Sequence, residues 1–236
     1  MKSLNGTIEA TDRAQEPLHG RWYGDACGAS FAMELMGERW SLHVMRELMM
    51  GPLRFSQIRA NLPGISAKVL TERLEKLGQA GVVVRRMLPP PASVQVYELT
   101  PWGYEAEEVM KALGRWSVRS RAHDPTLPLT PVSAMLSLRT MLRVRADFDA
   151  TVDFLFATDQ FRGTLKNGEL TFQRLVEPDG TADLTFAAAS PNAVLPYFYG
   201  KRPLADVERD FGLSVFGDRD LADRFCSLFA LPPKVS

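Results

Sequence analysis

The side chains with the most evident chemical role in this sequence are basic ones, and they are concentrated in one segment. Residues 39–86 contain nine lysine and arginine side chains but only three aspartate and glutamate side chains, although the formal net charge of the whole chain is zero. Residues 124–236 are acidic, with 12 basic and 15 acidic side chains. Lysine and arginine attract phosphate oxygens, so the segment 39–86 is suited to binding a polyanion and the C-terminal segment is not.

Catalytic chemistry has no comparable signature. The sequence lacks a nucleophile elbow, a phosphate-binding loop and a dinucleotide-binding fingerprint. The histidines, His19, His43 and His123, are far apart and do not have the spacing of metal ligands. Cys27 and Cys226 are also far apart, which indicates reduced thiols rather than a disulfide framework. We therefore expect a protein that is not an enzyme and that needs no metal and no cofactor.

Within the basic segment, residues 66–81 have the pattern of a short amphipathic helix. Ser66 is a residue type that caps helix N-termini, Ile65 and Leu70 fit a hydrophobic staple, and Gly81 favours termination. The apolar stripe consists of Leu70, Leu74 and Leu77. The opposite face carries Lys68, Thr71, Glu72 and Glu75. A helix with one buried stripe and one polar face suits a reader of the DNA major groove.

The neighbouring segments predict the elements that position this helix. Helices are expected over 31–36, 40–50, 55–61 and from 102 to about 119, and strands over 82–88 and 94–99. The proline-rich segment 89–93 between the strands predicts a stiff, protruding loop. The turn at 62–65 separates the third and fourth helices as in a helix-turn-helix. The expected arrangement is a winged helix-turn-helix.

In this order and spacing, the segment 27–118 resembles the HxlR-type family of bacterial transcriptional regulators. The matching motifs are Cys27, Gly37-Glu-Arg-Trp40, Gly51-Pro-Leu-Arg-Phe-Ser56, Leu62-Pro-Gly-Ile-Ser66, Leu70-Thr-Glu-Arg-Leu74, Gly81-Val-Val-Val-Arg85 and Tyr97-Glu-Leu-Thr-Pro-Trp-Gly103. The chain departs from the family pattern at Gly28, where a proline is usual, and at Arg39, where a lysine is usual. Neither change threatens the expected fold.

The resemblance implies a homodimer that binds a pseudo-palindromic operator in double-stranded DNA, with the helix at Ser66 in the major groove and the wing near the minor groove or the backbone. Lys68 and Thr71 are the expected base contacts, and Arg73 flanks them. The expected phosphate contacts are made by Arg54, Ser56, Ser66, Arg85 and Arg86. An apolar seam suited to a dimer is formed by Val109, Ala112, Leu113 and Trp116.

The chain divides into four expected parts: a flexible N-terminal arm (1–26), the winged helix domain (27–120), a proline-rich linker (121–131) and a second domain (132–236). No run of ~18 apolar residues indicates a membrane span. The N-terminus is polar and unlike a signal peptide. These features predict a cytoplasmic protein that does not bind membranes.

The C-terminal part predicts an α+β domain, so the whole chain is expected to be α+β. Strands are expected over 151–157, 161–166, 169–174, 182–188 and 210–216, and helices over 133–142, from Ser190 to Gly200 and after Asp218. The motifs Asn167–Leu170, Ser190–Ala193, Tyr199–Pro203 and Phe216–Asp220, in this order, resemble the sterol-carrier-protein fold. That resemblance implies an apolar tunnel for lipids or acyl chains, and hence the sensing of a hydrophobic small molecule.

Seven phenylalanines are candidates for lining such a tunnel, and the alternative is that they fill a solid core. They are Phe154, Phe156, Phe172, Phe186, Phe198, Phe225 and Phe229. Two alternative functions also stay open. Cys27 precedes a helix, where thiols have lowered pKa values, so the chain could instead sense oxidants or electrophiles. The chain could also be a lipid carrier without DNA binding.

Overall fold

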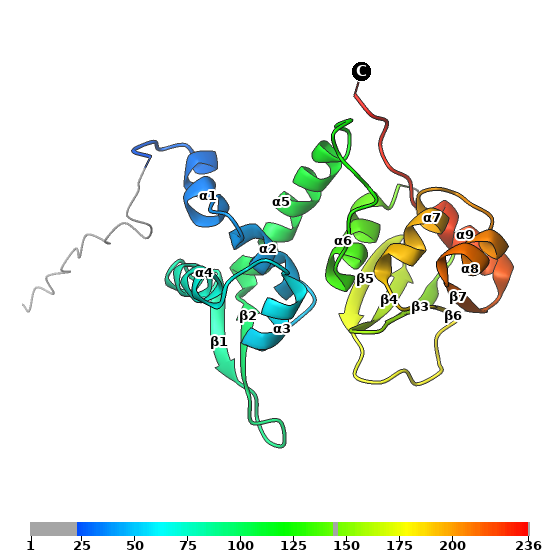
Figure 1. The fold of residues 1–236 in the computed structure, drawn as a ribbon, viewed down its shortest axis with the longest axis horizontal. Coiled ribbons are helices and arrows are strands. Elements are labelled where there is room, and N and C mark those ends of the chain that lie inside the picture. The colour runs from blue at the N-terminus through cyan, green and yellow to red at the C-terminus, as the bar shows by residue number, and fades with distance from the viewer. Residues whose placement is uncertain (1–22, 144–145, 236) are drawn as a thin grey trace, which may run out of the picture.

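The computed structural model describes residues 23–143 and 146–235. Most of the arm expected over 1–26 therefore lies outside the described residues. The N-terminal unit comprises α1 (Gly28–Met36), α2 (Ser41–Leu48), α3 (Phe55–Asn61), α4 (Ala67–Gln79), β1 (Val83–Met87), β2 (Gln95–Leu99) and α5 (Pro101–Ser117). This order is that of a winged helix-turn-helix, as the sequence predicts (Figure 1).

Helix α4 forms as its sequence predicts. The Ser66 hydroxyl accepts a hydrogen bond of 3.2 Å from the N–H of Val69, which satisfies one free donor of the first turn. Leu70, Leu74 and Leu77 are buried against the rest of the unit. Burying this stripe orients α4, because the opposite face must then point to solvent.

The wing is a two-stranded antiparallel hairpin whose register pairs Val83 with Leu99 and Met87 with Gln95. Its loop, 88–94, extends away from the rest of the molecule (Figure 1). Thr100 then caps α5, because its side chain accepts from the N–H of Gly103 at 3.0 Å. The hairpin and α5 are thereby joined by a single capping residue.

The C-terminal unit is a mixed sheet with helices packed on one face. It comprises α6 (Pro131–Met141), β3 (Ala150–Phe156), β4 (Gln160–Lys166), β5 (Glu169–Arg174), β6 (Leu184–Ala188), η1 (Pro191–Val194), α7 (Leu195–Phe198), α8 (Leu204–Phe211), β7 (Ser214–Gly217) and α9 (Arg219–Ser227). The five-stranded sheet has the order β5-β4-β3-β6-β7, and only the β3–β6 pair is parallel. The outer face is polar, with Thr164 and Gln173 exposed.

The phenylalanines expected to line a tunnel pack on one another instead. Phe154, Phe186 and Phe198 are fully buried, and the ring centroids of Phe154 and Phe186 are 5.3 Å apart. Phe198 lies 5.3 Å from Phe229, which lies 5.1 Å from Phe225. Such distances are those of rings in direct contact. Phe156 and the partly buried Phe172 also pack against Phe154, so this set forms a solid core.

Several expected boundaries were wrong. The strand expected over 210–216 is short, and α8 occupies 204–211 before it. The helix expected from Ser190 to Gly200 is divided into η1 and α7. The linker ends earlier than 131, because Thr130 caps α6 and Pro131 is its first residue. α2 begins at Ser41, because Trp40 has a left-handed backbone, with φ of 79°.

The two units are in contact through α2, α5 and α6. Helix α5 of the winged unit and helix α6 of the C-terminal unit lie side by side where the two units meet (Figure 1). An ion pair of 3.0 Å joins Arg139 on α6 to Glu107 on α5. Thr130 at the start of α6 donates a hydrogen bond of 2.8 Å to Glu47 on α2. Part of α6 therefore belongs to the junction as well as to the C-terminal core.

Candidate DNA interface

The exposed face of α4 is the centre of the candidate site. Lys68, Thr71 and Glu75 are all exposed on it, with about one turn between each and the next. Lys68 and Thr71 lie in the first half of the helix, close to the N-terminus, where the helix dipole is positive. Glu75 carries a negative charge further along the same face. A polyanion would therefore be best accommodated at the N-terminal half of α4.

The supporting helix α3 adds two groups near that end. Arg54 is the residue before α3 and Ser56 lies in its first turn, and both are exposed. The N–H of Arg54 donates to the side-chain oxygen of Gln57 at 2.8 Å, which fixes the start of the helix. Arg59, an exposed basic residue on the same helix, was not among the residues expected at the DNA surface. A basic residue next to the apolar Ile58, which is buried, was the sequence pattern that could have identified Arg59 as exposed.

The wing supplies two more arginines from β1. Arg85 and Arg86 are both exposed on the strand. Arg86 pairs with Glu98 of β2 at 2.9 Å, so part of its charge is neutralised within the hairpin. Arg85 takes part in none of the ion pairs found among residues 23–143 and 146–235. Of the two, Arg85 is the better placed to bind a phosphate.

Arg73 is placed differently from its expected role at the DNA surface. Its guanidinium pairs with Glu38, and its Nε donates to the carbonyl of Arg39 at 3.1 Å. The side chain is only 15% exposed. Lys76 binds the same Glu38 carboxylate at 2.6 Å. Arg73 therefore fixes α4 to the loop before α2, a contact between residues far apart in sequence.

Sequence reasoning missed a buried carboxylate, Glu47, which is 0% exposed. One of its oxygens accepts from Arg46 at 2.8 Å and from Thr130 at 2.8 Å. The other accepts from Asn61, the last residue of α3, at 3.2 Å. The signal was present, because Glu47 lies between Val44 and Leu48 on the apolar side of α2. A buried charge is tolerated only when it is paired in this way.

The two cysteines have opposite environments. Cys27 is exposed at the N-terminus of α1, where hydrogen bonds from the backbone N–H groups of Ser30 and Ala29 lower the pKa of its thiol. Cys226 is buried, and burial raises the pKa of its thiol. Its Sγ lies 3.7 Å from Nζ of Lys201. Of the two thiols, that of Cys27 is the accessible one and has the lowered pKa.

The helix-turn-helix, the exposed polar face of α4 and the basic hairpin together define a winged helix-turn-helix DNA-binding protein. The model of the HxlR-like helix-turn-helix family matches residues 35–124. The chain belongs to this family, and it is a transcriptional regulator of the HxlR type.

Two relatives illustrate the likeness, both from Bacillus subtilis (strain 168). The HTH-type transcriptional regulator YodB is 37% identical over 86 residues, which are 36% of this chain and 77% of that protein. The uncharacterized HTH-type transcriptional regulator YvaP is 34% identical over 86 residues, which are 36% of this chain and 80% of that protein. The structure of the reduced form of YodB covers 42% of this chain and 100% of its own, with 33% identity and a TM-score of 0.39.

In the part of the chain that the structure describes, no helix is long and apolar enough to span a membrane. No group of three or more histidine, cysteine, aspartate and glutamate side chains there is arranged to hold a metal ion.

Proposed function

We propose that this regulator binds a pseudo-palindromic operator as a homodimer, with α4 in the major groove and the hairpin near the minor groove or the backbone. The observation that carries this proposal is the two-sided character of α4: its leucine stripe is buried, and Lys68 and Thr71 are exposed. Side chains near the start of a recognition helix are those that reach base edges. Lys68 and Thr71 are therefore assigned to base recognition.

The phosphate contacts are assigned to exposed groups around α4. They are Arg54, Ser56, Ser66, Arg85 and Arg86. Contacts of this kind set affinity and register but carry no sequence information. Arg73 is left out of this set, because its guanidinium is already engaged by Glu38 and the carbonyl of Arg39.

The dimer seam is assigned to one face of α5. Val109, Leu113 and Trp116 are 44%, 42% and 73% exposed, and they repeat at helical spacing. Ala112 is exposed on the same side. A row of exposed large apolar side chains on one helix favours contact with a second copy over contact with water.

The test of DNA binding starts from DNA selected by the full chain from a random-sequence library. The double variant Lys68→Ala/Thr71→Ala is expected to lose preference for the selected sequence, while circular dichroism shows an intact fold. The single variant Lys166→Ala, at the exposed end of β4, is the control and is expected to bind as the wild type. Unchanged sequence preference in the double variant would refute the assignment of α4.

The C-terminal unit is proposed to have a sterol-carrier-like fold and to sense a hydrophobic small molecule. The support is the mixed five-stranded sheet with helices on its apolar face. Because the phenylalanine core is solid, the ligand is not assigned to it. A cavity of about 600 Å³ lies instead between the linker and α7, next to Leu195, Tyr199 and Phe211. Mass spectrometry of molecules that copurify with the full chain would test the sensing role.

Thiol sensing is the second candidate, and the environment of Cys27 favours it. Its thiol is exposed and has a lowered pKa. The test is DNA binding before and after treatment with a quinone, in the wild type and in Cys27→Ser. Loss of binding only in the wild type would support this candidate, and equal responses would reject it.

A further inference from the structure

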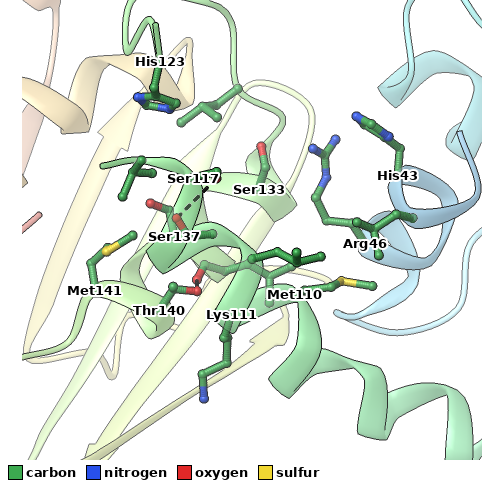
Figure 2. A pocket seen from close by; sticks show the side chains of 16 residues that line it. His43, Arg46, Met110, Lys111, Ser117, His123, Ser133, Ser137, Thr140 and Met141 are labelled. Carbon is green, nitrogen blue, oxygen red and sulfur yellow. Dashed lines mark hydrogen bonds between the residues drawn. The ribbon is translucent and has the colours of Figure 1, made fainter. Parts of the chain in front are cut away.

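A cavity of about 320 Å³ lies where the winged unit meets the C-terminal unit, between α2, α5 and α6 (Figure 2). Small-molecule sites commonly have volumes of ~300–1,000 Å³, so this one suits a compact ligand. Its apolar lining includes Leu42, Met110, Leu129 and Leu136. These side chains provide a surface for an apolar body.

The polar lining contains basic side chains and hydroxyl groups. His43, Arg46, Lys111 and His123 line the cavity, and its lining contains no aspartate or glutamate. Burial and the neighbouring Arg46 lower the pKa of His43, which favours its neutral form, and Lys111 is paired with Glu108 at 2.7 Å. Arg46 is therefore the cationic group on the α2 side. Figure 2 shows Arg46 and His43 together on the α2 side, whereas the amine of Lys111 points away from them. Hydroxyl groups of Ser133, Ser137 and Thr140 line the opposite wall on α6. Ser133 and Thr140 donate to the backbone carbonyls of Thr130 and Leu136, so their hydroxyl protons are already used. The guanidinium of Arg46 beside an apolar surface suits a ligand with one carboxylate.

One lining residue is connected to the helix-turn-helix through the buried carboxylate of Glu47. Arg46 donates through Nε at 3.0 Å and through Nη2 at 2.8 Å to the same oxygen of Glu47. Glu47 in turn holds Asn61 at the end of α3 and Thr130 at the start of α6. A ligand carboxylate at Arg46 would compete with Glu47 for the guanidinium. Occupancy would thereby change the contacts that fix α3 relative to α6.

We propose that this junction cavity is an effector site of the regulator, separate from the cavity beside α7, that it takes a small molecule with an apolar body and a single carboxylate, and that occupancy alters DNA binding through Arg46 and Glu47. Only the last part rests on the proposed function, because ligand binding is measurable without DNA. Linkage requires the reciprocal effect, so DNA changes the ligand affinity by the same factor.

The site is tested by filling the cavity from α5. A Cβ built at Gly114 meets only the Cγ2 of Thr140, at the ordinary contact distance of 3.6 Å. Gly114→Leu therefore places a side chain into the cavity, and Gly114→Ala is the matched control, which leaves it open. Both replacements favour a helix more than glycine does, so both are expected to fold.

The probes are 2-naphthoate and octanoate, with 2-naphthamide and octanamide as uncharged counterparts, titrated calorimetrically into the full chain. At least one carboxylate is expected to bind wild type about tenfold or more tighter than its amide. Gly114→Leu is expected to weaken that binding by at least about tenfold, and Gly114→Ala by less than about threefold. Equal binding to wild type and Gly114→Leu, or no binding of either carboxylate, would overturn the site.

Arg46 tests the charge preference. Arg46→Met is expected to bind the carboxylate and its amide alike, and Arg46→Lys to keep part of the preference, because it keeps a cation. An undiminished preference in Arg46→Met would overturn the role of Arg46. The DNA measurement is separate: the carboxylate is expected to change the affinity of the wild type for selected DNA, and not that of Gly114→Leu. No change in the wild type would overturn the coupling, whereas failure of the wild type to select any DNA would overturn the proposed function alone.

Discussion

The hydroxyl of Thr130 donates a 2.8 Å hydrogen bond to the buried carboxylate of Glu47. The same side chain accepts from the N–H of Ser133 at 3.1 Å and so caps α6. One residue thus begins the first helix of the C-terminal unit and fixes that helix to α2. Because Glu47 also holds Asn61, the end of α3 is part of the same hydrogen-bonded group.

Thr130→Val is expected to lower the free energy of unfolding by about 2 kcal/mol, because it removes both a helix cap and a donor to a buried carboxylate. Urea denaturation followed by circular dichroism measures this. Thr164→Val, at an exposed position of β4, is the control, with an expected change within about 0.5 kcal/mol. Equal stability of the two variants would contradict the role of Thr130.

Arg85 and Arg73 are expected to have different roles, Arg85 in binding DNA and Arg73 in stabilising the fold. Arg85→Ala should weaken binding to all DNA sequences and reduce the slope of log K against log salt by about 1, because one phosphate contact is lost. Arg73→Ala should leave that slope unchanged and lower the free energy of unfolding by about 1–2 kcal/mol, since it leaves Glu38 without its arginine. Salt titrations of DNA binding and urea denaturation of both variants separate the two roles. The opposite pattern would place Arg73 at the DNA after all.

The two thiols are expected to react at very different rates. A lowered pKa increases the thiolate fraction of Cys27 at neutral pH, whereas burial shields Cys226 and raises its pKa. Iodoacetamide should therefore modify Cys27 first. The modification rate should rise with pH and reach its plateau at a lower pH than the rate of an ordinary exposed thiol does. Peptide mass spectrometry over time measures both sites. Modification of Cys226 in the folded protein as fast as Cys27 would be evidence against this environment.

Trp116→Lys is expected to shift the protein from dimer to monomer, because it places a charge in the apolar seam on α5. Sedimentation velocity measures the change. Val176→Lys is a matched control, since Val176 is 96% exposed on a loop of the C-terminal unit. This substitution should leave the assembly unchanged. A Trp116→Lys protein that sediments like the wild type would remove α5 from the interface.

Local patterns predicted the winged unit well. The spacing of Leu70, Leu74 and Leu77 and the cap at Ser66 specify α4 through contacts within a few residues, and such contacts are readable from sequence. α8 was also readable, because Leu204 and Val207 are its buried residues and Gly212 ends it with a left-handed backbone. The strand expected over 210–216 overlaps only the end of α8, and no helix was expected over 204–209.

The remaining differences arise from contacts between distant residues. The pairing of Arg73 with Glu38 is decided by how α4 meets the loop before α2, and no pattern around Arg73 shows it. The phenylalanines alternate as inward-facing residues do whether they surround a tunnel or fill a core. Only the distances between their rings, such as 5.3 Å between Phe154 and Phe186, distinguish the two cases.

The Glu47–Thr130 hydrogen bond also crosses the end of the family match, which is at residue 124. A fragment cut at that residue would retain Glu47 but lose α6, and water would reach a carboxylate that the full chain keeps dry. The isolated winged unit is therefore not a small copy of the regulator. Its stability and its DNA affinity would be those of a protein whose α2 surface is exposed to solvent. Measurements on the fragment would therefore miss the contribution of the C-terminal unit to the winged unit.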